Sequence, residues 1–311
     1  MRTLLSVFVI LLCCAALHSE TYTLRTGNQG GTYYPIGQAI ASAVRQADST
    51  LVLRVEAGFG SVDNCRRLQA GRASFIIAQD NIVTAALVGT SEFAGERQAK
   101  LRHVATLFPE AVQVIVRRDA GITEWKDMRG RRVCLGEHGS GTQHDAEILL
   151  AAHGISPGSL DTCTMSFPEV ALGLSRGEVD AAFITSGVPT ASLASLQSVV
   201  ELSLLPLDPE TAAAIMEQYP LYKAVNITPG DYAFLKDDVL CLGCTAQLLC
   251  SEDVPEDVVY RLCKALWEHT DVLAASHPMG AAIHVERALQ YRSAPLHDGA
   301  VRYYTEAGLL Q

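Results

Sequence analysis

The sequence predicts an α/β protein made of two similar lobes joined by two crossing strands. Short β-branched segments alternate with helical periods, which is typical of an α/β fold with a largely parallel sheet. Two pairs of segments also repeat the same plan in the two halves of the chain. Because 49% of the 311 residues are hydrophobic and 19% are charged, the chain has material for one large or two medium cores.

The first half of the chain shows the alternation in order. Good N-cap residues, Ser61 and Asp80, precede two of the helical periods, and Pro35 suits the first turn of another. The predicted elements are strands at 21–26, 51–57 and 74–79, with helices at 33–47, 61–70 and from 80 onward. Ligands of such sheets bind at the carboxyl ends of the strands, so the loops that follow them are candidate sites.

The internal repeats predict the lobes. Residues 68–79 and 174–187 each run from a helix end through a glycine into a buried strand with polar residues at its end. Residues 112–128 and 245–262 each run from an apolar strand through acidic residues into a helix. Chance similarity of common α/β pieces is the alternative explanation.

Two crossing strands would explain both repeats. We therefore predict lobe I at residues 20–115 with 245–311 and lobe II at residues 116–244. The crossing strands would bend near residues 114–117 and 244–248.

The first 19 residues, "MRTLLSVFVILLCCAALHS", have the pattern of a secretory signal peptide. Arg2 precedes an apolar run that is short for a bilayer span, and small or polar residues follow it. We expect export to the periplasm with cleavage near Ser19. An uncleaved anchor, or a lipid on Cys13 or Cys14, is the alternative.

Charge and cysteine content narrow the function further. The formal net charge is −10, and no block of Lys or Arg could bind a phosphate backbone, so the composition argues against nucleic-acid binding. Seven cysteines follow the signal peptide, an odd number that leaves at least one thiol unpaired and a connectivity that the sequence does not determine. Cys241 and Cys244 have the spacing of a metal knuckle but no second pair, so we expect no metal and no cofactor.

The stretch "TGNQGGTYYPIG", residues 26–37, is the first candidate binding turn. Gly30 and Gly31 lie just before a helix that opens at Thr32 or Tyr33, where free N–H groups and the positive end of the helix dipole favour an anion. Neither a dinucleotide motif nor a P-loop is present. The spacing therefore favours a carboxylate, with the tyrosines as walls and hydroxyl donors.

A comparable turn occurs in the second half. In "GEHGSGTQHDAEILLAA", Ser140 and Gly141 precede a helix that begins near Thr142. The ends of the two repeated strands would face the same cleft, and the residues there are Gln79, Asp80, Ser186, Gly187 and Pro189. Two turns, one in each lobe, would hold a small dianion from opposite sides.

A hydrolase is the competing interpretation, because Ser140 lies near His138, His144 and Asp145. The spacing lacks the GxSxG elbow, and no HExxH motif occurs. Triad residues are assembled in space, so their local clustering is weak support for catalysis. We expect that the protein is not an enzyme.

Several motifs resemble one family in order and spacing: "TGNQGGTYYPIGQAIA", "GSVDNCRRLQAG", "FPEAVQVIVRRDAGI", "DMRGRRVCLGEHGSGT", "GEVDAAFITSGVPT" and "PLHDGAVRYYTEAGL". The resemblance is to the TAXI-type solute receptors of TRAP transporters, and it covers residues 21–311. It implies a type II-like periplasmic-binding-protein fold that closes on a small organic anion, such as glutamate, glutamine or 2-oxoglutarate. It also implies delivery to TRAP membrane subunits by a receptor that we expect to be a monomer.

By position, the resemblance places the ligand on both turns. The matching residues of lobe I are Gly31, Thr32, Tyr33, Gln79 and Asp80, and those of lobe II are Ser140, Gly141, Thr142 and Ser186 to Pro189. An amino acid also needs an acceptor for its ammonium group, and Asp80 or Glu110 would supply one. A sensor of the same fold is the alternative to a transport receptor.

Overall fold

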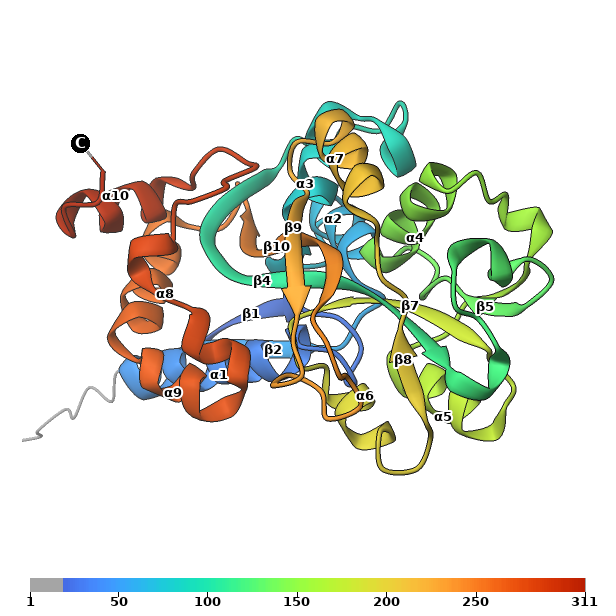
Figure 1. Cartoon of the computed structure of the whole chain (residues 1–311). Helices are drawn as coiled ribbons and strands as arrows, with labels where there is room; N and C mark the ends of the chain where they lie inside the picture. Colours follow the sequence, from blue (N-terminus) through green and yellow to red (C-terminus); the bar gives the residue numbers. More distant parts are fainter. Residues whose placement is uncertain (1–18, 311) are drawn as a thin grey trace, which may run out of the picture.

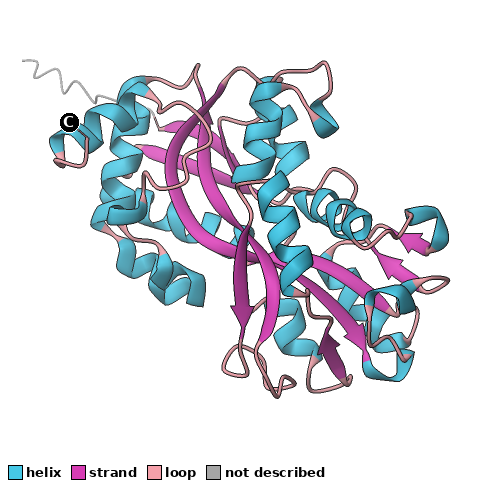
Figure 2. Cartoon of the chain, turned by 45° about the horizontal axis from the view of Figure 1, so that its top comes forward, coloured by secondary structure: helices cyan, strands magenta, loops and turns pink. Residues whose placement is uncertain are grey.

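Two long strands, β4 (Leu101–Arg117) and β10 (Val239–Ser251), run antiparallel through the molecule and connect its two lobes (Figures 1 and 2). The structure is a computed structural model that describes residues 19–310. The predicted signal peptide lies outside the described residues except for Ser19. The two-lobed α/β fold is the one that the sequence predicts.

Lobe I surrounds the three strands that precede β4 and includes the C-terminal helices. Figure 1 shows α1, α8, α9 and α10 together on this side. Its elements are β1 (Glu20–Arg25), α1 (Tyr33–Ala47), β2 (Leu51–Glu56), α2 (Ser61–Gln69), β3 (Phe75–Gln79), α3 (Asp80–Val88), α8 (Glu256–Glu268), α9 (Thr270–Ser276), α10 (Asp298–Glu306) and the short 3-10 helices η1 (Ser91–Phe93), η5 (Pro278–Ala282) and η6 (Val285–Arg287).

Lobe II lies between the two long strands in the chain. Its elements are β5 (Arg132–Cys134), α4 (Gly141–Ala152), β6 (Asp161–Cys163), α5 (Phe167–Arg176), β7 (Ala181–Ser186), α6 (Ala191–Leu196), β8 (Leu202–Leu204), α7 (Pro209–Gln218), β9 (Lys223–Ile227) and the 3-10 helices η2 (Arg118–Ala120), η3 (Trp125–Met128) and η4 (Pro157–Ser159).

One mixed sheet passes through both lobes in the order β2-β1-β3-β10-β4-β7-β5-β6. Strands pair in parallel at both ends of this order, but every pairing of β4 or β10 is antiparallel. The prediction of a largely parallel sheet is therefore wrong for its centre. The reason is that the long strands cross between the lobes and run opposite to β3 and β7.

The internal repeats correspond to matched positions in the sheet. β3 ends the first repeated segment and pairs with β10, and β7 ends the second and pairs with β4. Each short strand therefore lies antiparallel to a long one. Its carboxyl end leads toward the region between the lobes.

The hydrophobic cores divide along the long strands. In β4, Phe108 packs in the core of lobe I and Ala111 in a core of lobe II. In β10, the division falls between Cys244 and Ala246. The predicted lobe boundaries and the bending points stay predictions, and these two divisions show where each strand changes its packing partners.

Two predicted helix caps are displaced by one residue. Gly60 and Gln79 are the N-caps of α2 and α3, so Ser61 and Asp80 are the first helical residues. Both side chains instead bond to neighbouring strands: the Ser61 hydroxyl accepts from the N–H of Gln79 (3.1 Å), and Asp80 Oδ1 accepts from that of Thr245 (3.1 Å).

The remaining sequence questions concern cysteines and membrane helices. The seven cysteines of the described residues carry free thiols. Cys241 and Cys244 pack into different cores, so their side chains do not meet as a metal knuckle. Within residues 19–310, no helix has the length and apolar character needed to cross a membrane, and no cluster of three His, Cys, Asp or Glu residues is arranged for a metal.

Candidate functional site

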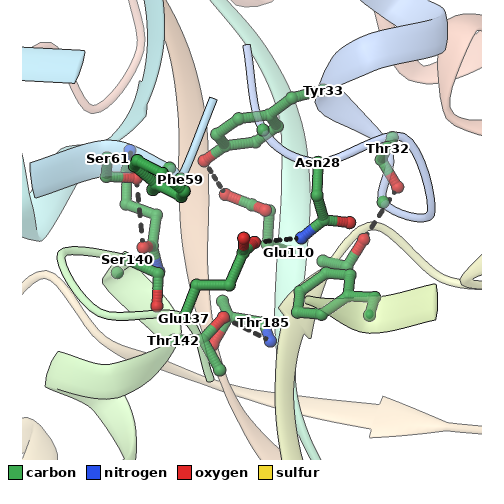
Figure 3. Close-up of a pocket in the computed structure, with 17 residues that line it drawn as sticks. Asn28, Thr32, Tyr33, Phe59, Ser61, Glu110, Glu137, Ser140, Thr142 and Thr185 are labelled. Atoms are coloured by element: carbon green, nitrogen blue, oxygen red, sulfur yellow. Dashed lines mark hydrogen bonds between the residues drawn. The ribbon is translucent and has the colours of Figure 1, made fainter. Parts of the chain in front are cut away.

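A cavity lies between the two lobes, at the carboxyl ends of β3 and β7 (Figure 3). Its volume is about 410 Å³, counting the part open to solvent. It is lined by Gly27, Asn28, Gly31, Thr32, Tyr33, Phe59, Gly60, Ser61, Gln79, Glu110, Glu137, Ser140, Gly141, Thr142, Phe167, Thr185 and Ser186.

Five helix N-termini contribute to the wall of this cavity. Residues at the starts of α1, α2 and α3 line it from lobe I, and residues at the starts of α4 and α5 line it from lobe II. The first N–H groups of a helix have no partner within the helix, and its dipole is positive at that end. The cavity is therefore suited to a carboxylate that both lobes contact.

The lobe I turn uses its hydroxyl across the cleft. Thr32 makes no side-chain cap on α1, and its hydroxyl lies 2.9 Å from that of Ser186 in lobe II. Close by, the amide of Asn28 donates to Oε2 of Glu137 at 2.7 Å (Figure 3). Both bonds join the lobes at the edge of the cavity.

In the lobe II turn, the hydroxyl groups make hydrogen bonds within lobe II. Ser140 caps α4 by accepting from the N–H of Gln143 at 3.1 Å. The hydroxyl of Thr142 accepts from the N–H of Thr185 at 3.2 Å, which fixes the helix start against the end of β7. The hydroxyl groups of Ser140 and Thr142 therefore accept hydrogen bonds from backbone groups of their own lobe.

Gly141 is required by close approach rather than by its backbone angle. A Cβ there would lie 1.2 Å from Oε1 of Gln79, so the Gln79 amide fills the space beside the start of α4. Nε2 of the same amide donates to Asp145 at 2.7 Å, and Oε1 accepts from Ser61 at 3.2 Å. Gln79 thus connects the starts of α2 and α4 across the cleft.

Asp145 of α4 is the centre of a buried polar network behind the cavity. Its Oδ2 accepts from Gln79 and, at 2.6 Å, from Thr185, and its Oδ1 accepts from Asn81 at 3.1 Å and from Tyr222. Gln79 and Asn81 belong to lobe I, whereas Asp145, Thr185 and Tyr222 belong to lobe II. Because charged acceptors make the stronger hydrogen bonds, this network stabilises the contact between the lobes.

Two carboxyl groups line the cavity, and no lysine or arginine occurs among its lining residues. Glu110 is 2% exposed and accepts from the Tyr33 hydroxyl at 2.7 Å. Burial raises the pKa of Glu110 well above its usual value, and the charges of Asp145 and Asp80 add to the rise. Burial also raises the pKa of Glu137, at the edge of the cavity.

The structure brings most of the predicted site residues to this one cavity. Those that line it are Gly31, Thr32, Tyr33, Gln79, Glu110, Ser140, Gly141, Thr142 and Ser186. The other three predicted residues, Asp80, Gly187 and Pro189, are not among the lining residues.

Each of these three has a local reason for its position. Asp80 turns toward β10, where it accepts from Thr245, and burial raises its pKa to about 6. The carbonyl of Gly187 accepts from Thr32 and faces lobe I from behind Ser186. Pro189 follows a cis peptide bond in the loop beyond Gly187.

Sequence reasoning missed eight lining residues. Asn28 and Glu137 lie inside the two glycine-rich stretches, and Thr185 is one residue before the predicted Ser186. "GFGS", residues 58–61, is a third run of glycines before a helix, the same signal that marked the other two turns. The missed residues are Gly27, Asn28, Phe59, Gly60, Ser61, Glu137, Phe167 and Thr185.

The triad of the hydrolase interpretation is not assembled. Nδ1 of His144 bonds Glu92 of lobe I at 2.6 Å, while Ser140 caps its helix. His138 is exposed, and no histidine is among the lining residues of the cavity. Ser140 therefore has no base beside it among the described residues.

Comparison with known proteins places the chain in a family. The model of the NMT1-like family matches residues 24–308, so the chain belongs to the NMT1-like family. Solved structures of periplasmic binding proteins share its two-lobed fold, although the sequence identities are low.

Three of these structures show the extent of the similarity. MatC (Rpa3494) from Rhodopseudomonas palustris with bound malate is 16% identical over 92% of this chain and 97% of its own, with a TM-score of 0.59. The periplasmic binding protein BugD is 13% identical over 93% of this chain and 94% of its own, with a TM-score of 0.55. A putative L-cystine ABC transporter protein from Listeria monocytogenes is 13% identical over 86% of this chain and 99% of its own, with a TM-score of 0.53.

Proposed function

We propose that this protein is an extracytoplasmic solute receptor that closes its two lobes on a small organic carboxylate. The observation that carries the proposal is the convergence of five helix N-termini, from both lobes, on one cavity. A carboxylate there would accept from N–H groups of both lobes at once. Such a ligand stabilises the closed arrangement, because only that arrangement offers both sets of donors.

The solute that this site fits best is glutamate or a related amino acid or dicarboxylate such as 2-oxoglutarate. The likeness to MatC, whose structure holds malate, supports a dicarboxylate in a cleft of this fold. The glycine turns at residues 26–37 and 136–142 support a TAXI-type receptor, which would deliver its solute in the periplasm to the membrane subunits of a TRAP transporter.

A thermal-shift screen of the mature protein tests the proposal. Protein that has been unfolded and refolded to remove any carried-over solute is heated with glutamate, glutamine, aspartate, 2-oxoglutarate, succinate, malate, neutral amino acids or sugars. A ligand at a hundred times its dissociation constant stabilises the folded protein by about 2.7 kcal/mol. A large shift with a carboxylate supports the receptor, whereas shifts only with sugars would contradict it.

A further inference from the structure

Glu110 is a buried acid in the cavity that has no positive partner. It lies on β4, beside the point where the strand passes from one lobe to the other, and it is 2% exposed. Its Oε2 accepts from Tyr33, and Oε1 has no hydrogen-bond partner among the described residues. A buried carboxylate without a counter-charge is costly, so the group either stays protonated or binds a cation.

The groups packed around Glu110 increase this cost. The titratable groups that face it are Tyr33 from α1, Asp80 from α3, Asp145 from α4 and Cys244 from β10. None of them is a cation. Since no lysine or arginine lines the cavity either, a positive charge beside an ionised Glu110 would have to come from a ligand.

The other lining groups already have partners. Glu137 accepts from Asn28, and both atoms of the Gln79 amide are engaged by Ser61 and Asp145. Glu110 is thus the lining acid that has both a free oxygen and deep burial. This distinguishes it from Glu137, which is half-buried at the edge of the cavity.

We propose that Glu110 selects solutes that carry a cationic nitrogen, and that it gives up a proton when such a solute binds. The inference rests on the proposed function and deepens it. The N–H groups at the helix starts hold the ligand carboxylate, and the Glu110 carboxylate holds the ligand ammonium. The proton leaves Glu110 for bulk water as the ligand's charge replaces it, so protons and charge balance. A keto acid of the same shape has no such charge, and it leaves the proton in place.

The sign of the pH dependence follows from this exchange. Burial raises the pKa of Glu110 in the ligand-free protein. Below that raised pKa, binding of an amino acid releases up to one proton, and its affinity rises with pH by up to about tenfold per pH unit. The affinity of 2-oxoglutarate gains nothing from Glu110 as the pH rises.

Calorimetry with glutamate and 2-oxoglutarate tests the inference. Both are titrated into the full mature protein between pH 6 and pH 8, in buffers of different ionisation enthalpy that reveal proton release. We expect glutamate to bind more tightly and to release protons, and 2-oxoglutarate to bind without release from Glu110. In Glu110→Gln, the loss of a charge-assisted hydrogen bond should lower the affinity for glutamate by about ten- to a hundredfold and abolish the proton release.

Two further variants keep the test decisive. Glu137→Gln makes the same chemical change at the edge of the same cavity, and proton release should persist in it. Tyr33→Phe removes the hydroxyl that bonds Glu110 and should change the pH at which release occurs. Circular dichroism of each variant excludes misfolding.

The outcomes separate this inference from the proposed function. If 2-oxoglutarate binds as tightly as glutamate, or if glutamate binds with no proton release that Glu110→Gln removes, the inference is wrong while the receptor function stands. If no compound of the screen binds, both are overturned.

Discussion

The two glycine turns of this protein look alike in sequence, but they use their hydroxyl groups for different purposes. In lobe I, Thr32 leaves α1 uncapped and reaches Ser186 across the cleft. In lobe II, Ser140 caps α4 and Thr142 bonds the backbone of Thr185. One turn thus contributes a contact between lobes, and the other mainly fixes its own helix.

This difference shows that a shared motif predicts a shared ligand site better than it predicts shared energetics. Both turns place the start of a helix at the cavity. A hydroxyl that bonds within one lobe stabilises folding, whereas a hydroxyl that bonds across the cleft stabilises closure. Mutations in the two turns should therefore separate stability from affinity.

The glycines should give the largest effect. In Gly141→Ala, the new Cβ would overlap the Gln79 amide and displace it from Ser61 and Asp145. Overpacking of this kind costs about 1–3 kcal/mol, and separation of the lobes relieves it. We expect ligand affinity, measured by calorimetry, to fall by that amount while the melting temperature without ligand changes little.

Gly31→Ala is the matched change in lobe I. Its Cβ would lie 3.1 Å from the ring of Phe167, so a small shift of the ring accommodates it. The loss of affinity should be clearly smaller than in Gly141→Ala. Equal losses would mean that the close contact at Gly141 does not control closure.

The threonines come next. Thr142→Ala leaves the buried N–H of Thr185 without its acceptor, which costs about 1–3 kcal/mol of stability. Thr32→Ala removes a bond between lobes, so it should cost about 1 kcal/mol of ligand affinity and little stability. Urea unfolding and calorimetry of both variants measure the two quantities. If Thr32→Ala lost stability and Thr142→Ala did not, the assignment of Thr32 to lobe closure and of Thr142 to folding would be wrong.

The helix cap should give a moderate effect. Ser140→Ala removes the side chain that accepts from Gln143, and loss of an N-cap costs about 1 kcal/mol of stability. Urea unfolding measures this cost. Ser140→Asp, which keeps a good N-cap, should preserve most of the stability, and an equal loss in both variants would show that the cap is not the cause.

The smallest effect should come from the ion pair between Glu92 and His144, which joins the lobes near the start of α4. Burial opposes the charged form of His144, but the hydrogen bond with Glu92 and the charges of Asp145 and Glu92 outweigh it and raise the pKa of His144. Burial likewise opposes the charge of Glu92, yet the partner histidine leaves its pKa lowered.

The pair stabilises the closed lobes while both groups are charged. Because the pKa of His144 is higher in the closed arrangement, this contribution is complete below the ordinary histidine pKa and is lost as the pH rises through the raised value. We expect a loss of affinity of at most about 1 kcal/mol over that range. His144→Gln should remove this dependence but not the proton release assigned to Glu110, and affinity titrations from pH 5.5 to pH 8 compare them. A pH profile that His144→Gln leaves unchanged would exclude the ion pair as its cause.

Much of the site could be predicted from the sequence because its signals are local. Glycines before a helix and polar residues at the end of a buried strand pointed to the turns at Thr32 and Ser140 and to Gln79 and Ser186. Phe167 could not be predicted, because nothing in its own segment indicates that the lobes meet there. The position of Asp80 was decided by β10, a strand far away in the chain.

By itself, the sequence determined the alternation of strands and helices, the two-lobed plan and the glycine turns, because backbone preferences and hydrophobic periodicity act over short segments. Only the tertiary structure decided the antiparallel centre of the sheet, the different uses of Thr32 and Thr142, and the isolation of the Glu110 carboxyl. These features depend on which segments come into contact when β4 and β10 cross between the lobes. Those contacts determine which side chains are buried and which groups they bond.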